Sequence, residues 1–303
     1  MVGVVVVDKP AGPTSHDVVQ RVRRLSGERR VGHAGTLDPL ATGVLLICIG
    51  RATGIAQYLM AGDKEYTATA LFGVATTTQD VTGEELRSAD ASRLTARALE
   101  DALPAFRGPV RQTPPMVSAV KRGGRRLYEL ARQGIEVERE ARPVTIHHLE
   151  LLDFRAGERA EADLRVVCSV GTYVRALVHD LGESLGVGAC MSALRRTRSG
   201  SFTLADATSL ESLAEHGVEH ALRPVAEALS DWPRDVVTAD EMERLLHGSA
   251  LPREDAGGSD TVTLAVSPEG CAIAVCRRNG GVLQPVRIVA PESLETAGGS
   301  ARC

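Results

Sequence analysis

The sequence lacks any apolar run long enough to cross a lipid bilayer, because none approaches the roughly 20 residues that such a span needs. The apolar run at residues 2–7 ends after six residues, where the chain reaches Asp8 and Lys9. It is too short for a secretory signal peptide and has no basic segment in front of it. We therefore expect a cytoplasmic protein with no membrane partner.

Cysteine pairs at metal-binding spacing are also missing. None of the cysteines forms a Cys-x-x-Cys pair, and most of them lie in apolar, strand-like runs. Zinc sites usually show such pairs, and disulfide frameworks are typical of small secreted chains. The pattern predicts reduced thiols in the core and no metal site. The residues concerned are Cys48, Cys168, Cys190, Cys271, Cys276 and Cys303.

An overall basic excess is absent too, since the net charge is −4 and the chain holds only three lysines. The charge is unevenly distributed, however. Residues 201–303 contain 16 acidic and 8 basic residues, whereas the first 200 contain 27 basic and 23 acidic ones. An anionic partner would therefore meet the N-terminal two-thirds of the chain. The preference for arginine over lysine is explained more simply by the base composition of the genome than by selection for an anionic partner.

The length of 303 residues and a hydrophobic content of 43% suit one large domain and a smaller one. Apolar patterns predict strands and helices that alternate without the steady repeat of a doubly wound sheet. We expect an α+β fold, with a mixed, mainly antiparallel central sheet flanked by helices. The expected strands are 2–7, 44–49, 64–74, 144–154 and 162–169, and the expected helices are 14–25, 55–60, 96–103 and 172–185.

Two segments depart from this pattern. Residues 107–142 are polar and rich in arginine, which predicts an inserted, mobile arm with a short helix at 125–133. After Trp232 and Pro233 the sequence changes to an acidic helix, a Gly257-Gly258 linker and short strands near 261–266, 271–276 and 282–289. We therefore predict a domain at 1–232, a small β domain at 233–296 and a flexible tail at 297–303.

A carboxylate stands in the most conspicuous loop of the sequence. Residues 32–43 read Gly-His-Ala-Gly-Thr-Leu-Asp-Pro-Leu-Ala-Thr-Gly, with Asp38 between glycines that permit unusual backbone conformations. Loops fixed by flanking strands often carry catalytic groups. An aspartate beside glycine and proline also commonly just forms a turn. Both interpretations of Asp38 stay open on this pattern alone.

Five ordered motifs between residues 3 and 202 resemble those of the TruB family of bacterial tRNA pseudouridine-55 synthases. The Asp38 loop, extended to Val44 and Leu45, matches the family's catalytic loop without a gap. The remaining motifs lie before and after it, and the segment after residue 233 weakly resembles a PUA-like β-barrel. The other four motifs are residues 9–15, residues 64–66, residues 112–115 with 118–121, and residues 171–175.

The resemblance implies a role for each matching residue. Asp38 takes the place of the nucleophile, and Arg175, in the first turn of a helix that Thr172 would cap, pairs with it. Asp80 resembles a further carboxylate of this charge network, although an aspartate before glycine also suits a turn. Tyr66 matches the active-site tyrosine. The residues matched to uridine or RNA binding are His33, Tyr173, Leu194, Lys9, Lys121, Arg125 and Arg126.

The arm has two further features, a cluster of basic residues and one departure from the family pattern. The segment 121–132 contains Lys121, Arg122, Arg125, Arg126 and Arg132 against Glu129, a charge pattern that suits phosphate contacts but also an ordinary solvated helix. Val117 stands where the family usually has an aromatic residue. This departure concerns the packing of the arm more than the chemistry.

The implied reaction is the isomerisation of the T-loop uridine of tRNA to pseudouridine after the base has been flipped out. It exchanges a C–N for a C–C glycosidic bond without a redox change, so no cofactor is expected. A monomer that binds the T-arm of tRNA is the expected assembly. Alternatives are a phosphotransferase, which Leu40 disfavours because such sites need Asp-x-Asp, an RNA-binding protein without turnover, and the same chemistry on another RNA.

Overall fold

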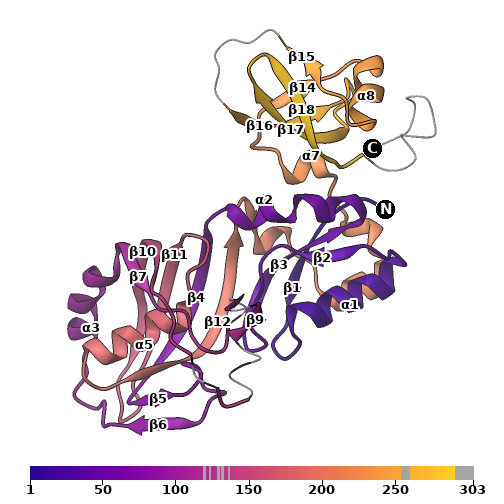
Figure 1. The fold of residues 1–303 in the computed structure, drawn as a ribbon. Coiled ribbons are helices and arrows are strands. Elements are labelled where there is room, and N and C mark those ends of the chain that lie inside the picture. Colours follow the sequence, from indigo (N-terminus) through magenta and orange to yellow (C-terminus); the bar gives the residue numbers. More distant parts are fainter. Residues whose placement is uncertain are drawn as a thin grey trace. The chain divides into compact units, whose positions relative to one another are not determined.

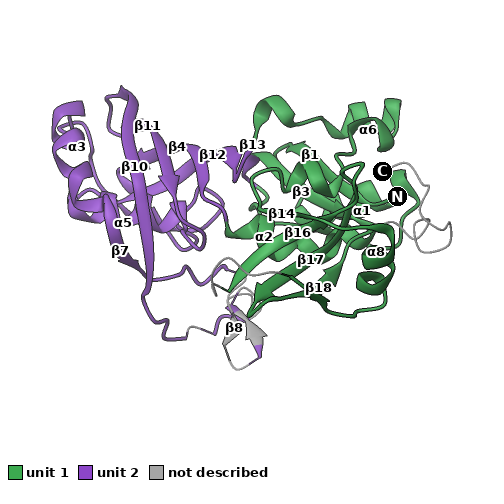
Figure 2. Cartoon of the chain, turned by 90° about the horizontal axis from the view of Figure 1, so that it is seen from above, with its two compact units in different colours: residues 1–39, 43–61, 202–303 green, residues 40–42, 62–201 purple. Residues whose placement is uncertain are grey.

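The computed structural model describes residues 1–118, 121–122, 124–127, 130, 133–135, 137–253 and 260–290. The chain divides into two compact units, each built from strands and helices (Figures 1 and 2). Unit 1 comprises residues 1–39, 43–61 and 202–303, and unit 2 comprises residues 40–42 and 62–201. The mixed α+β class predicted from the sequence is confirmed.

Unit 1 begins with a strand, a turn and a helix, as the sequence predicts. Strand β1 (Gly3–Lys9) pairs antiparallel with β3 (Thr42–Ile49), and β3 also pairs with β2 (Val31–His33). Helix α1 (Ser15–Ser26) starts at Thr14, whose hydroxyl accepts a hydrogen bond from the Asp17 amide while the Asp17 carboxylate accepts one from the Thr14 amide. This reciprocal capping fixes the start of the helix.

The C-terminal part of unit 1 forms a five-stranded sheet that contains the three expected strands. Its order is β14 (Arg234–Val236), β16 (Thr261–Val266), β17 (Ala272–Asn279), β18 (Val282–Ile288) and β15 (Leu251–Pro252). Helix α8 (Ala239–Leu246) packs against it.

One buried cluster joins the two parts of unit 1. It contains Val6 and Leu46 of the N-terminal strands together with Leu264 and Val275 of the C-terminal sheet. The C-terminal sheet therefore shares a core with the N-terminal strands. The division of the chain into domains at residue 233 stays a prediction.

Unit 2 is built on an antiparallel sheet. Helix α5 (Val174–Ser184) contacts its strands β12 and β4, and helix α3 (Ala96–Ala102) contacts β10. Buried and half-buried residues alternate along β4, as a strand with one covered face requires. The strand order is β12 (Ala189–Ser199), β4 (Lys64–Phe72), β11 (Glu161–Cys168), β10 (Arg142–Arg155) and β7 (Gly108–Gln112).

Short elements complete the two units. Every helix of the described residues is too short or too polar to span a bilayer. The short helices are η1 (Gly50–Ile55), α2 (Ala56–Ala61), η2 (Leu103–Phe106), η3 (Leu204–Asp206), α6 (Leu210–His216), η4 (Glu219–Ala221) and α7 (Val225–Ala228). The short strands are β5 (Val74–Thr76), β6 (Glu85–Ser88), β8 (Lys121–Arg122), β9 (Arg125–Arg126) and β13 (Phe202–Thr203).

Three local predictions were wrong. The expected helix at 125–133 does not begin at Arg125, because β8 and β9 form a hairpin whose turn holds Gly124 at φ +83°. Helix α5 starts at Val174 and not at Thr172, whose hydroxyl instead donates to the Ser169 carbonyl. Cys271 is disulfide-bonded, so the expectation of reduced thiols fails for this residue.

Candidate active site

Hydrogen bonds hold the Asp38 loop on both sides of the aspartate, all within unit 1. The Ser15 hydroxyl donates to the Leu37 carbonyl at 2.9 Å and accepts from the Leu37 amide at 2.8 Å. On the other side, the Gly12 amide donates to the Pro39 carbonyl at 2.9 Å. The segment before α1 therefore fixes the residues that flank Asp38, which is itself partly exposed.

Lys9 belongs to the same support. It is fully buried, and its ammonium donates to the carbonyls of Pro10 at 2.9 Å and Pro39 at 3.2 Å. These contacts connect the end of β1 to the Asp38 loop, because Pro39 directly follows the aspartate. Its assignment to RNA binding stays a prediction, while its contacts in the structure are to the loop.

Glycines with left-handed backbone angles shape this loop. Gly35 has φ +102° and Gly43 has φ +99°, which side chains other than glycine's rarely permit. The third glycine, Gly32, lies in β2 beside His33, which pairs with Ile47 of β3. The conformational freedom predicted from the sequence is thus used at two of the three glycines, and a short strand leads from His33 into the loop.

Arg175 and Asp80 lie together in unit 2, almost completely buried. Arg175 is the second residue of α5, and its Nη1 lies 3.4 Å from Oδ2 of Asp80. The guanidinium also donates to the carbonyls of Thr78 at 2.9 Å and Val117 at 2.8 Å. The aspartate supplies negative charge to a cation that the positive end of a helix disfavours. The structure thus shows Asp80 in contact with Arg175, while its part in the expected catalytic charge network stays a prediction.

Asp80 also forms the turn that the alternative interpretation predicts. Its Oδ1 accepts from the hydroxyl of Thr78 at 2.7 Å and from the amide of Thr82 at 3.0 Å. Gln79, just before it, has φ +64°, the only positive value for a non-glycine residue in the described part of the chain. One carboxylate therefore organises the turn with one oxygen and faces Arg175 with the other.

Tyr66 and Leu194 point to the same face of the unit 2 sheet. In the register of β4 and β12, Tyr66 pairs with Arg196 and Ala68 pairs with Leu194, so these four side chains share one side. Tyr66 and Leu194 are 9% and 8% exposed. Arg196, at 1% exposed, is a buried cation that sequence reasoning missed. Its place two residues after Leu194 on an alternating strand was the available signal.

Lys64 lies on the same face of β4, two residues before Tyr66, and is buried as well. Burial, together with the positive charge of Arg196, lowers the pKa of Lys64 to about 8. The ammonium donates to the Gly62 carbonyl. This face of the sheet thus concentrates two cations beside a tyrosine, an environment suited to an anionic group.

Tyr173 caps α5 and is held by Gln112, a second residue that sequence reasoning did not single out. The Gln112 side chain donates to the Tyr173 carbonyl at 2.9 Å and accepts from the Tyr173 amide at 2.7 Å. Gln112 belongs to the motif at 112–115, which was its only signal. A paired amide of this kind fixes the backbone just before Arg175.

The arm is described only in part. Lys121, Arg125 and Arg126 lie on the hairpin of β8 and β9, while Arg132 and Glu129 lie outside the described residues. The phosphate contacts expected of the basic residues of the arm therefore stay predictions.

The predicted site residues fall into two groups. Unit 1 holds His33, Lys9 and Asp38, and unit 2 holds the others. The pairing of Asp38 with Arg175 stays a prediction, because the two residues belong to different units.

Among the described residues, no group of three or more His, Cys, Asp or Glu side chains is arranged to bind a metal ion. Burial also raises the pKa of the Cys48 thiol to about 12 and that of Cys168 to about 11. Thiols protonated at neutral pH are poor nucleophiles. Within the described part of the chain, the partly exposed Asp38 is a better candidate nucleophile than these two cysteines.

Comparisons with known proteins cover almost the whole chain. Residues 23–174 match the TruB family pseudouridylate synthase N-terminal domain, and residues 175–230 match the tRNA pseudouridylate synthase B C-terminal domain. Residues 232–290 match the C-terminal domain of tRNA pseudouridine synthase II. Together these matches extend from α1 to the end of the C-terminal sheet.

Individual relatives agree with these matches. A protein of Symbiobacterium thermophilum named tRNA pseudouridine synthase B is 57% identical over 82% of this chain and 82% of its own. A protein of the same name from Mycobacterium tuberculosis strain H37Rv is 47% identical over 96% of this chain and 97% of its own. The structure resembles one titled as a Cbf5-Nop10-Gar1 complex, with a TM-score of 0.73, 25% identity and coverage of 99% and 87% of the two chains. The chain therefore belongs to the TruB family of pseudouridylate synthases.

Proposed function

We propose that this enzyme isomerises the T-loop uridine of tRNA, uridine 55, to pseudouridine, with Asp38 as the essential carboxylate. The observation that carries the proposal is the Asp38 loop, in which the residues on both sides of a partly exposed carboxylate are fixed by hydrogen bonds. A catalytic group needs such positioning. The name that the relatives carry, tRNA pseudouridine synthase B, supports tRNA as the substrate.

The chemistry breaks the bond between N1 of uracil and C1′ of ribose and forms a bond between C5 and C1′. The base rotates while detached, and after the new bond forms C5 loses its proton while N1, which carries no hydrogen in uridine, gains one, so the reaction is a net isomerisation. The carboxylate of Asp38 either adds covalently or removes the 2′ proton to give a glycal. Both routes need an anionic carboxylate, and neither consumes an external reactant.

The other matched residues receive supporting roles in this proposal. In this proposal Arg175, which contacts Asp80, pairs with Asp38, and the ring of Tyr66 stacks on the flipped uracil. His33 holds the rearranged loop of the RNA. Swinging a base out of its stack costs a few kcal/mol, so groups that replace its neighbours are required. A tRNA-modifying enzyme meets its substrate in the cytoplasm, where we place this monomeric protein.

The test is Asp38→Asn, which keeps the shape of the side chain and removes its negative charge. Because an amide lacks the nucleophilicity and basicity of a carboxylate, the variant should bind tRNA and form no detectable pseudouridine. The measurement is single-turnover tritium release from tRNA labelled at C5 of uridine, with mapping of the modified position and a separate binding titration.

Asp231→Asn is the matched control, because it makes the same chemical change at an exposed aspartate for which no contact was found in the described part of the chain. It should keep normal activity. A thermal melt of both variants separates lost chemistry from lost folding. Near-normal turnover by a folded Asp38→Asn protein would refute the role of Asp38, and modification at another position would refute the substrate assignment.

A further inference from the structure

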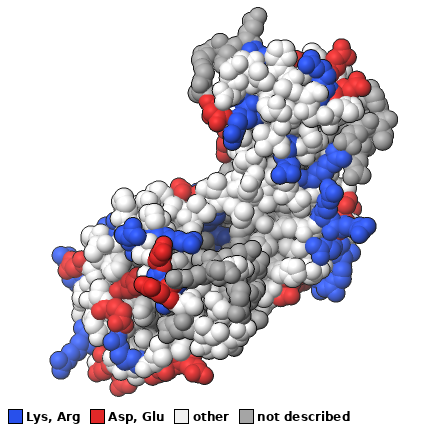
Figure 3. Space-filling model, in the orientation of Figure 1, with Lys and Arg blue, Asp and Glu red and all other residues white. Residues whose placement is uncertain are grey.

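Four exposed arginines surround the C-terminal half of α1 in unit 1. Arg21 and Arg24 lie on the helix, three residues apart and away from its buried side, and Arg29 and Arg30 follow the turn that ends it. Figure 3 shows Lys and Arg side chains gathered over the part of the molecule that carries α1. We call these four residues the α1 arginine patch.

The patch lacks compensating carboxylates. Within the described residues, none of the four arginines forms a hydrogen bond or an ion pair through its side chain. Glu28, the single acidic residue between Arg21 and Arg30, instead contacts the amino group of Met1. Arg23, in contrast, is half-buried and donates to Gln20 and to the Val31 carbonyl, so it serves the fold. Four like charges so close together are best stabilised by an anion from outside.

The patch has a defined position relative to Asp38 because both lie in unit 1. Helix α1 starts beside the Asp38 loop, where Ser15 binds Leu37, and it rises about 1.5 Å per residue, which puts Arg24 about 14 Å farther along. By a second route, β3 runs from Thr42, at the end of the loop, to Ile49, and the amide of the next residue, Gly50, donates to the Arg30 carbonyl. Seven strand residues span about 23 Å.

We propose that the α1 arginine patch binds phosphates of the RNA stem next to the loop that carries the target uridine. The charge spacing along one strand of B-DNA, roughly 3.4 Å, is an upper limit for the rise of an RNA stem, so a span of about 20 Å covers at least about six nucleotides along one strand. The occupant is therefore the RNA backbone at a distance from the reacting base. Such contacts position the RNA without reading its sequence. The proposal rests on the proposed function, whose RNA substrate it extends.

The experiment uses two double variants and one fourfold variant. One double variant combines Arg21→Gln and Arg24→Gln, the other combines Arg29→Gln and Arg30→Gln, and the fourfold variant carries all four changes. The fourfold variant should raise the Kd for full-length tRNA about tenfold at about 0.15 M salt and lower the slope of log Kd against log salt by about 3. Each double variant should give about half of the slope change. Pseudouridine formation at saturating tRNA should stay near normal, because no change touches the Asp38 loop.

Arg93→Gln with Arg97→Gln is the matched control, since it removes two exposed arginines of unit 2 and should leave the Kd and its salt slope unchanged. A second arm uses a T-loop hairpin whose stem is cut to about three base pairs, about half of the estimated six-nucleotide span. The effect of the fourfold variant should shrink on this RNA. An unchanged salt slope in folded variants on full-length tRNA, or an equal effect on both RNAs, would overturn the proposal. Failure of the proposed function would appear separately, as absent pseudouridine with the unsubstituted enzyme.

Discussion

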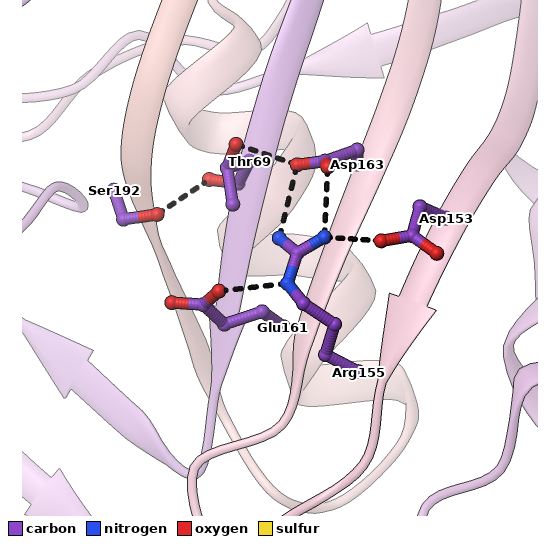
Figure 4. Close-up of polar contacts among 6 residues, drawn as sticks. All are labelled: Thr69, Asp153, Arg155, Glu161, Asp163 and Ser192. Carbon is purple, nitrogen blue, oxygen red and sulfur yellow. Dashed lines mark hydrogen bonds and ion pairs between the residues drawn. The ribbon is translucent and has the colours of Figure 1, made fainter.

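Unit 2 contains two arginine sites that differ in burial. Arg175 and Asp80 have side chains only 4% and 7% exposed, and the guanidinium lies 3.4 Å from the carboxylate of Asp80. The side chain of Arg155 is 43% exposed and contacts three carboxylates, those of Asp153, Glu161 and Asp163 (Figure 4). Three carboxylates around one cation would suggest that the exposed site is the stronger one.

Burial reverses that order. A charge removed from water needs every one of its partners, and losing one leaves an uncompensated charge in a medium of low dielectric constant. An exposed arginine that loses a carboxylate regains water, so surface pairs contribute little. The hydrogen bonds that Arg155 donates to Asp163, Glu161 and Asp153 raise its pKa further, but a guanidinium is charged at neutral pH in any case. The comparison therefore predicts large effects at Arg175 and small ones at Arg155.

The largest expected effect comes from Arg175→Lys. The guanidinium reaches the Thr78 carbonyl, the Val117 carbonyl and Asp80 in three directions, which a single ammonium on a shorter chain cannot match. The rate of single-turnover pseudouridine formation should fall on the order of 100-fold, because a small displacement of a positioning group can lower a rate by this much. The affinity for tRNA should be unchanged. The same Arg-to-Lys change at Arg155 is the control and should leave the rate unchanged. Equal rates for both variants would remove Arg175 from the proposed mechanism.

Asp80→Asn should come next, with its effect on stability. The amide keeps the shape and the bond to the Thr82 amide but leaves the buried guanidinium of Arg175 without this negative charge. The free energy of unfolding should fall by about 3 kcal/mol, measured by urea denaturation. Asp163→Asn makes the same change in the exposed network and should shift Tm by no more than about 2 °C. A smaller loss of stability in Asp80→Asn than in Asp163→Asn, with both variants measured in the same way, would break the comparison.

Local patterns predicted most of the fold, but not the contacts of Lys9, Gly12 and Ser15 that support the Asp38 loop. The apolar run before Lys9, the cap at Thr14 and the alternation along β4 each depend on residues close in sequence, so their elements followed from the sequence. The hairpin of β8 and β9 did not, because its strands of two residues are too short to show a period. Gly123-Gly124 was the missed signal, since two glycines suit a two-residue hairpin turn.

The partners of buried polar groups were harder to predict. Motif matching indicated Arg175 and Asp80, but their contact joins positions 95 residues apart and only the fold brings them together. Gln112 binds the backbone of Tyr173, and Arg196, whose only signal was its place two residues after Leu194, is buried where β12 pairs with β4. Contacts to backbone atoms leave no complementary residue in the sequence. A search for matching side chains therefore misses them.

Basic residues of the arm extend the comparison to charges that have a proposed partner outside the protein. Replacing Lys121, Arg125 and Arg126 together with Ala should weaken tRNA binding about tenfold and lower its salt dependence, because each phosphate contact adds to the slope. Turnover at saturating tRNA should stay largely intact. Binding titrations at several salt concentrations provide the test, with Arg93→Ala and Arg97→Ala as the control pair. An affinity that is unchanged at low and moderate salt would exclude the arm from RNA binding.

Arg155→Gln should have the smallest effect, although it removes the most contacts. The substitution leaves Asp153, Glu161 and Asp163 as neighbouring negative charges, but water and salt screen them at this exposed site. Tm should fall by no more than about 2 °C at low salt, and the difference from the unsubstituted protein should shrink further in 1 M salt, where the Debye length is about 3 Å. Pseudouridine formation should be unchanged. A large fall in Tm that persists in high salt would mean that the network acts through packing and not through screened charge, and burial would then no longer explain the difference from Arg175.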